Sequence, residues 1–172
     1  MARPGNDPHR SLPGRAISVY SLHMANRSGE QQQLTPARVR LLSTQLGKQM
    51  VEAFDRAPDV ASAVVTIGAQ FARSLAESGY RDTGPVTAAA ALVAGDNPEV
   101  RAACTEAYTN WLNGLAWCLQ RKGVPAGESA ALAEVLLSGI QGALLLARVR
   151  QDTAPIHQVT ATLGALAATA VV

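Results

Sequence analysis

A chain of 172 residues holds one well-buried domain and leaves no room for two domains of ordinary size. Apolar residues make up 48% of the sequence and aromatic residues only 4%, which predicts an all-α fold whose core is filled by small aliphatic side chains. The net charge of +2 is uneven, since the first 40 residues carry six basic and two acidic side chains, whereas the remainder carries nine basic and eleven acidic ones.

Residues 1–34 are interrupted by prolines and glycines and contain a run of three glutamines without helical period. We therefore expect a basic, partly disordered arm or the remnant of a DNA-binding domain, followed by one helical domain over residues 35–172. The positive charge of the arm fits a contact with nucleic acid, although an ordinary solvated tail explains it equally well. Because no continuous apolar run follows Met1, we expect no secretory signal and a cytoplasmic location.

Two helices are predicted in the first half of the domain. Thr35-Pro36 is a capping side chain followed by proline, which opens a helix that reaches about Asp55. A second helix follows Pro58 and ends at Ser78-Gly79, and its apolar residues Val60, Val64, Ile67, Phe71 and Leu75 form one narrow stripe at 100° per residue. A short alanine-rich helix is expected at about residues 85–93.

A central helix is predicted from Pro98 to about Lys122. Asn97 ahead of Pro98 supplies the start signal, and Gly123 with Pro125 supplies the end. One broad apolar face contains Val100, Cys104, Ala107, Tyr108, Trp111, Leu112, Leu115 and Cys118. We expect this helix to contact several neighbours at once.

The last two predicted helices, about residues 129–150 and 155–172, are apolar over wide faces. A lone protomer would leave part of this area in water, so we expect two copies to form a four-helix bundle. The expected interface residues are Leu136, Ile140, Leu144, Ile156, Val159, Leu163 and Leu166. A membrane span is disfavoured, because Glu134 and Gln141 interrupt the most apolar run.

Reactive chemistry finds little support in the sequence. There is no nucleophile elbow, phosphate-binding glycine loop or metal motif, so we expect neither an enzyme nor a metal or other cofactor. Cys104 and Cys118 share the central helix about 21 Å apart at about 1.5 Å of rise per residue, which rules out a disulfide between them within one chain.

A pocket for a small hydrophobic molecule fits the pattern better. The central helix would be flanked by the two helices before it, giving mostly apolar walls. The expected ligand-binding residues are Met50, Phe54, Phe71, Leu75, Cys104, Tyr108, Trp111 and Leu115. The alternative is that these residues simply fill the core.

The order of segments resembles the C-terminal regulatory domain of TetR-type transcriptional regulators, in particular the LmrA-like branch. The resemblance covers roughly residue 35 to the C-terminus. It rests on the stretch from Ser78 to Ala90, the phrase from Asn97 to Cys104, the position of Trp111, and the run from Gly142 to Arg148. It implies a bundle of about six helices, a homodimer, a small effector and a role as a repressor, with the helix from Thr35 to Asp55 transmitting the effector's signal.

Such regulators read DNA with a helix-turn-helix placed ahead of this domain. Residues 1–34 match its end only faintly, and the candidate DNA contacts are Arg15, Tyr20, His23 and Arg27. Since nothing upstream of them has the apolar period of two supporting helices, we expect DNA binding to be weak and without sequence selectivity. The alternative is a dimeric α-helical ligand-binding or scaffold protein without an operator.

Overall fold

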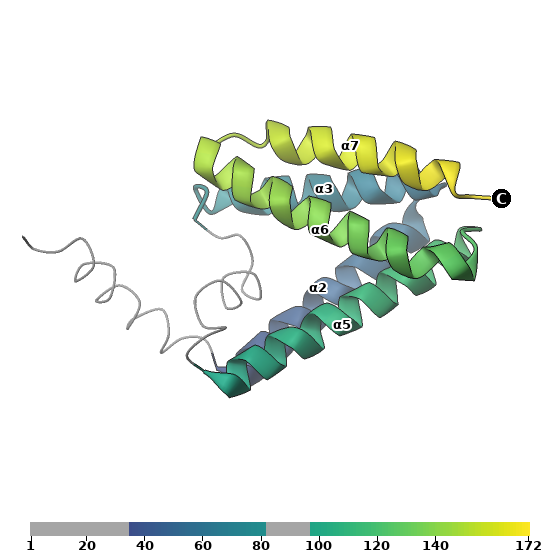
Figure 1. The fold of residues 1–172 in the computed structure, drawn as a ribbon. Coiled ribbons are helices and arrows are strands. Elements are labelled where there is room, and N and C mark those ends of the chain that lie inside the picture. The colour runs from purple at the N-terminus through teal and green to yellow at the C-terminus, as the bar shows by residue number, and fades with distance from the viewer. Residues whose placement is uncertain (1–34, 82–96) are drawn as a thin grey trace, which may run out of the picture.

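The computed structural model describes residues 35–81 and 97–172, which form five helices (Figure 1). These are α2 (Pro36–Arg56), α3 (Val60–Glu77), α5 (Pro98–Arg121), α6 (Ala126–Arg150) and α7 (Ala154–Thr169). The described residues contain no strand, so the all-α prediction is confirmed for them. The expected arm over residues 1–34 and the expected short helix over residues 85–93 lie outside the described ranges.

The capping signals set the starts of α2 and α5 as the sequence predicts. Thr35 Oγ1 accepts a hydrogen bond of 3.2 Å from the backbone N–H of Arg38, and Pro36 is the first residue of α2. Asn97 Oδ1 accepts two bonds of 3.1 Å from the first turn of α5. At α7 the accepting oxygen comes from Asp152, which receives the N–H of Ala154 at 3.0 Å.

The start of α6 differs from the prediction by three residues. The helix begins at Ala126, directly after Pro125, instead of at about Ser129. Ser129 is completely buried inside the first turn, where its hydroxyl donates to Ala126 O and accepts from Gln120 Nε2 at 2.8 Å. The serine therefore ties α6 to α5 and does not cap it.

The helices pack in two connected groups (Figure 1). In one group α2 lies along α5, and in the other α7 lies against α3 and α6. Contacts of α5 with α6 and of α2 with α3 join the groups. Consequently α2 packs mainly against α5, whereas α3 and α7 pack mainly against each other.

Glycines bring α3 and α7 into close contact. A Cβ atom on Gly68 would overlap the side chain of Thr160, and one on Gly164 would lie 3.0 Å from the carbonyl oxygen of Ala61. Neither position therefore accepts a larger residue without a shift of the helix opposite. This contact fixes α7 within its own protomer.

Helix α6 is long and apolar enough to cross a membrane by length and composition alone. In this fold it packs against α5, α7 and α3, and buries Leu136, Ile140 and Leu144 within the protomer. Part of the apolar surface of α6 therefore belongs to the core of the bundle.

Candidate functional site

A cavity of about 250 Å³ opens between α2 and α5, midway along the pair. Its described lining residues are mostly apolar or small, and none of them carries a charge. They are Ser43, Thr44, Gly47, Met50, Val51, Asn110, Trp111, Gly114, Leu115 and Cys118. The cavity lies just below the range of roughly 300–1,000 Å³ that is typical of sites for drug-sized ligands.

Trp111 forms a rigid wall of this cavity. Its side chain is 3% exposed, and its indole Nε1–H donates to the backbone oxygen of Ser43 at 2.9 Å. Tyr108 packs edge-on against the ring, with centroids 5.3 Å apart and planes at 77°. Because the indole N–H is already bonded to α2, the ring offers only carbon surface to a ligand.

The cavity exists because small residues face each other across the two helices. A Cβ atom on Gly47 would lie 3.5 Å from Trp111 Cδ1, in ordinary contact, and one on Gly114 would meet nothing within 4 Å. On α2 the residues Ser43 and Gly47 are four apart, as are Asn110 and Gly114 on α5. Residues four apart lie on the same face of a helix, so each helix presents a shallow depression to the other.

The polar groups around the cavity are uncharged. Burial is the main cause that raises the pKa of the Cys118 thiol, and the nearby Asp55 carboxylate raises it further, so the thiol stays protonated at neutral pH. The hydroxyl of Thr44 donates to Arg40 O at 2.9 Å. Ser43 is 5% exposed, and within residues 35–81 and 97–172 its hydroxyl has no hydrogen-bond partner.

Two ion pairs join α2 to α5 on either side of the cavity. Arg40 Nε lies 2.8 Å from Glu106 Oε2, and Arg121 Nη1 lies 2.7 Å from Asp55 Oδ1. All four side chains are about half exposed, so each pair contributes at most about 1 kcal/mol. Near the second pair, Lys122 Nζ donates to Ala57 O at 2.6 Å, which makes the C-terminal end of α2 the more firmly attached end.

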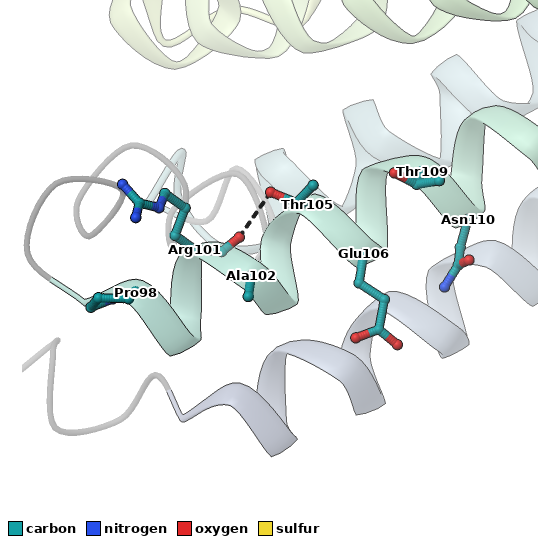
Figure 2. Close-up of a pocket in the computed structure, with 7 residues that line it drawn as sticks. All are labelled: Pro98, Arg101, Ala102, Thr105, Glu106, Thr109 and Asn110. Atoms are coloured by element: carbon teal, nitrogen blue, oxygen red, sulfur yellow. Dashed lines mark hydrogen bonds between the residues drawn. The ribbon is translucent and has the colours of Figure 1, made fainter.

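A second, larger depression of about 530 Å³ runs along the N-terminal half of α5 (Figure 2). Its described lining residues all belong to α5 and are Pro98, Arg101, Ala102, Thr105, Glu106, Thr109 and Asn110. In Figure 2 these side chains line one side of the helix, and Thr105 bonds back to the carbonyl oxygen of Arg101. Among the described residues, the cavity between α2 and α5 is lined by two helices, so we take it as the candidate site.

Of the eight residues expected to bind a ligand, Met50, Trp111 and Leu115 line the cavity. Phe54, Leu75 and Cys104 lie in the core, while Phe71 and Tyr108 are half-buried and pack against it. Sequence reasoning missed Ser43, Thr44, Gly47, Val51, Asn110, Gly114 and Cys118. The matching pairs of small residues four apart on α2 and α5 are the signal that could have found them.

The residues expected at a dimer interface differ in their exposure. Leu136, Ile140, Leu144 and Ile156 are buried in the protomer's own core, Val159 and Leu163 are partly buried, and Leu166 is 49% exposed. The apolar side chains that α6 exposes are Val135, Leu145, Leu146 and Val149. Spacings of three and four residues alternate along the exposed residues Val135, Ser138, Gly142, Leu145 and Val149, which places these five along one side of α6.

Other candidate sites add little. The four candidate DNA contacts Arg15, Tyr20, His23 and Arg27 lie outside the described residues. Where the structure describes the chain, no three histidine, cysteine, aspartate or glutamate side chains gather into a group that could hold a metal ion. Glu106, a carboxylate at the α2–α5 contact, is paired with Arg40.

Comparison with known proteins gives one family. The family model described as the C-terminal domain of LmrA/YxaF-like transcriptional regulators matches residues 60–162, from the start of α3 into α7. No curated protein matches the sequence.

Proposed function

This chain belongs to the TetR-type transcriptional regulators through their LmrA/YxaF-like C-terminal domain, and from this premise we propose that it is a repressor that senses a small hydrophobic effector. The observation that carries the proposal is the uncharged cavity between α2 and α5, with the fixed indole of Trp111 as one wall. The family is one of regulators, and we propose no catalytic role.

Helix α2 is the element suited to report on an effector. It has α5 as its main partner, and the cavity lies within that contact. Its C-terminal end is held by Arg121 and Lys122, whereas its N-terminal half is held by the ion pair of Arg40 with Glu106 and by the hydrogen bond from Trp111 to Ser43 O. An effector that binds one spacing of α2 and α5 better than another shifts the population toward that spacing. Movement of α2 would then reach whatever precedes Thr35.

We further propose that two copies associate through α6 and α7, as the family resemblance implies. The support is the exposed apolar line of Val135, Leu145 and Val149 on α6, with Gly142 small enough to let a partner helix approach closely. On α7, Leu166 adds a further exposed apolar side chain. A soluble cytoplasmic dimer is the form in which we expect the protein to act.

Operator binding is a separate part of the proposal. We expect any binding to be weak and unselective. A gel shift of the full chain against its own upstream DNA and a scrambled duplex, at fixed salt, tests this expectation. Nanomolar discrimination between the duplexes contradicts it, and no shift at all favours a ligand-binding or scaffold protein of the same fold.

The sensor proposal is tested by ligand-dependent thermal stabilisation. A neutral aromatic compound at about 100 times its Kd adds roughly 2.7 kcal/mol of stability to a protein that binds it only when folded. The variant Gly114→Leu fills the cavity, since a Cβ atom at Gly114 meets open space, and we expect it to lose the stabilisation. Gly127→Leu is the matched control, because Gly127 on α6 is equally open but distant from the cavity. Equal stabilisation of both variants would refute the site.

A further inference from the structure

The size of the cavity suits a small ligand. A dry, apolar cavity of roughly 150 Å³ is large enough to hold benzene. At about 250 Å³, the space between α2 and α5 admits a benzene ring with a short substituent, whereas a three-ring skeleton would require the helices to open. Trp111 limits the width of the space, because its hydrogen bond to Ser43 and its contact with Tyr108 hold the ring in place.

The charges near the cavity disfavour an ionised ligand. None of the ten described lining side chains is charged, and Cys118 stays a neutral thiol because burial raises its pKa. The charged groups beyond either end are already paired, Arg40 with Glu106 and Asp55 with Arg121. An ion in the cavity would lose its hydration and gain no partner, a loss of several kcal/mol for an unpaired buried charge.

One polar group in the cavity has no hydrogen-bond partner among the described residues. Ser43 is 95% buried and lines the space, and its hydroxyl forms no hydrogen bond with any residue in the described ranges. Serines inside helices often bond back to the preceding turn, as Thr44 does to Arg40 O. A buried hydroxyl left without a partner is costly, so a ligand oxygen that bonds to it gains affinity.

We infer that the cavity between α2 and α5 selects a small, uncharged, one-ring aromatic molecule that bears a hydroxyl or carbonyl group for Ser43. This inference rests on the proposed sensor function and narrows it to one chemical class. The ring lies against Trp111 between Gly47 and Gly114, and the oxygen of the ligand exchanges a hydrogen bond with the Ser43 hydroxyl.

Four probes with one skeleton test the inference by calorimetric titration of the full chain at pH 7. They are 4-propylphenol, propylbenzene, 4-propylbenzoate and 4-propylbenzylammonium. We expect the phenol to bind most tightly, the hydrocarbon roughly threefold to tenfold more weakly, as one hydrogen bond of ordinary net strength implies, and neither ion to bind measurably. In Ser43→Ala the phenol and the hydrocarbon should bind equally, whereas Ser138→Ala on the exposed side of α6 should keep the difference.

The outcomes separate the two proposals. If either ion binds as tightly as the phenol, and Gly114→Leu abolishes that binding, the inference about ligand class is overturned while the sensor proposal stands. If Ser43→Ala leaves the preference for the phenol unchanged, the role of Ser43 is refuted. If none of the four probes binds, the cavity is not an effector site and both proposals fail.

Discussion

Replacing Leu145 by alanine tests the proposed association of two copies at a single side chain. Leu145 is 60% exposed on the outer side of α6. Full burial of a leucine side chain contributes about 2 kcal/mol, so covering the exposed part is worth roughly 1.2 kcal/mol. In a two-fold symmetric dimer the residue occurs twice, which gives roughly 2.4 kcal/mol, or about a sixtyfold rise in the dimer Kd.

Sedimentation velocity over a dilution series measures that Kd directly. Leu41→Ala is a matched control, because Leu41 is also 60% exposed but lies on α2, away from the proposed interface. We expect the control to keep the Kd of the parent protein. A parent chain that is monomeric at high micromolar concentration, or two variants with the same Kd, would refute the reasoning.

Three further predictions concern stability and reactivity. Gly68→Ala should lower the free energy of unfolding by about 1–3 kcal/mol in urea titrations, since its Cβ overlaps Thr160, and adding Thr160→Ala should restore most of the loss. The N–H of Ser62 donates to Asp59 at 2.7 Å and lowers the pKa of that carboxyl from its usual value, so the contribution of Asp59 to folding stability is full above the unfolded pKa and is lost as the pH falls through the lower folded pKa. Between pH 6 and pH 2 the unfolding midpoint should therefore fall less for Asp59→Ala than for the parent protein, and parallel curves would contradict this. Cys118, whose pKa is raised by burial, should react with a disulfide reagent at pH 7.5 far more slowly than the unfolded chain does, and equal rates would show that the thiol is accessible.

The helices follow closely from local sequence signals. Thr35-Pro36 and Asn97-Pro98 mark the starts of α2 and α5. In each pair the side-chain oxygen accepts a hydrogen bond from a first-turn N–H that has no partner within the helix, and the proline has no N–H that would need one. Such signals act within four residues of chain, so they can be recognised without knowledge of the fold. The start of α6 departs from the predicted Ser129 because the hydroxyl of this serine bonds to Gln120 on another helix.

The cavity was harder to predict. Helical periodicity shows which residues face inward, but it does not show where the inward side chains are too small to meet. Phe54 and Leu75 are therefore in the core, as their pattern implies, yet outside the cavity. The space depends on Ser43 and Gly47 lying opposite Gly114, and that register between α2 and α5 is a tertiary feature.

The interface residues of α6 show a similar ambiguity. Because α6 is apolar on more than one side, its sequence does not reveal which side packs on its own protomer. In the fold, Leu136, Ile140 and Leu144 are buried inside the protomer, whereas Leu145 and Val149 are exposed. The proposed dimer surface therefore lies on the neighbouring side of the helix.

The most direct test of effector binding between α2 and α5 is a ¹⁹F spectrum of the full chain labelled with 5-fluorotryptophan. The chain has two tryptophans, Trp111 in the wall of the cavity and Trp117, which is 50% exposed and does not line it. A Trp117→Phe variant assigns the two signals. On addition of 4-propylphenol we predict a shift of the Trp111 signal with the Trp117 signal unchanged. A shift of Trp117 alone, or of neither signal at saturating probe, would contradict the account.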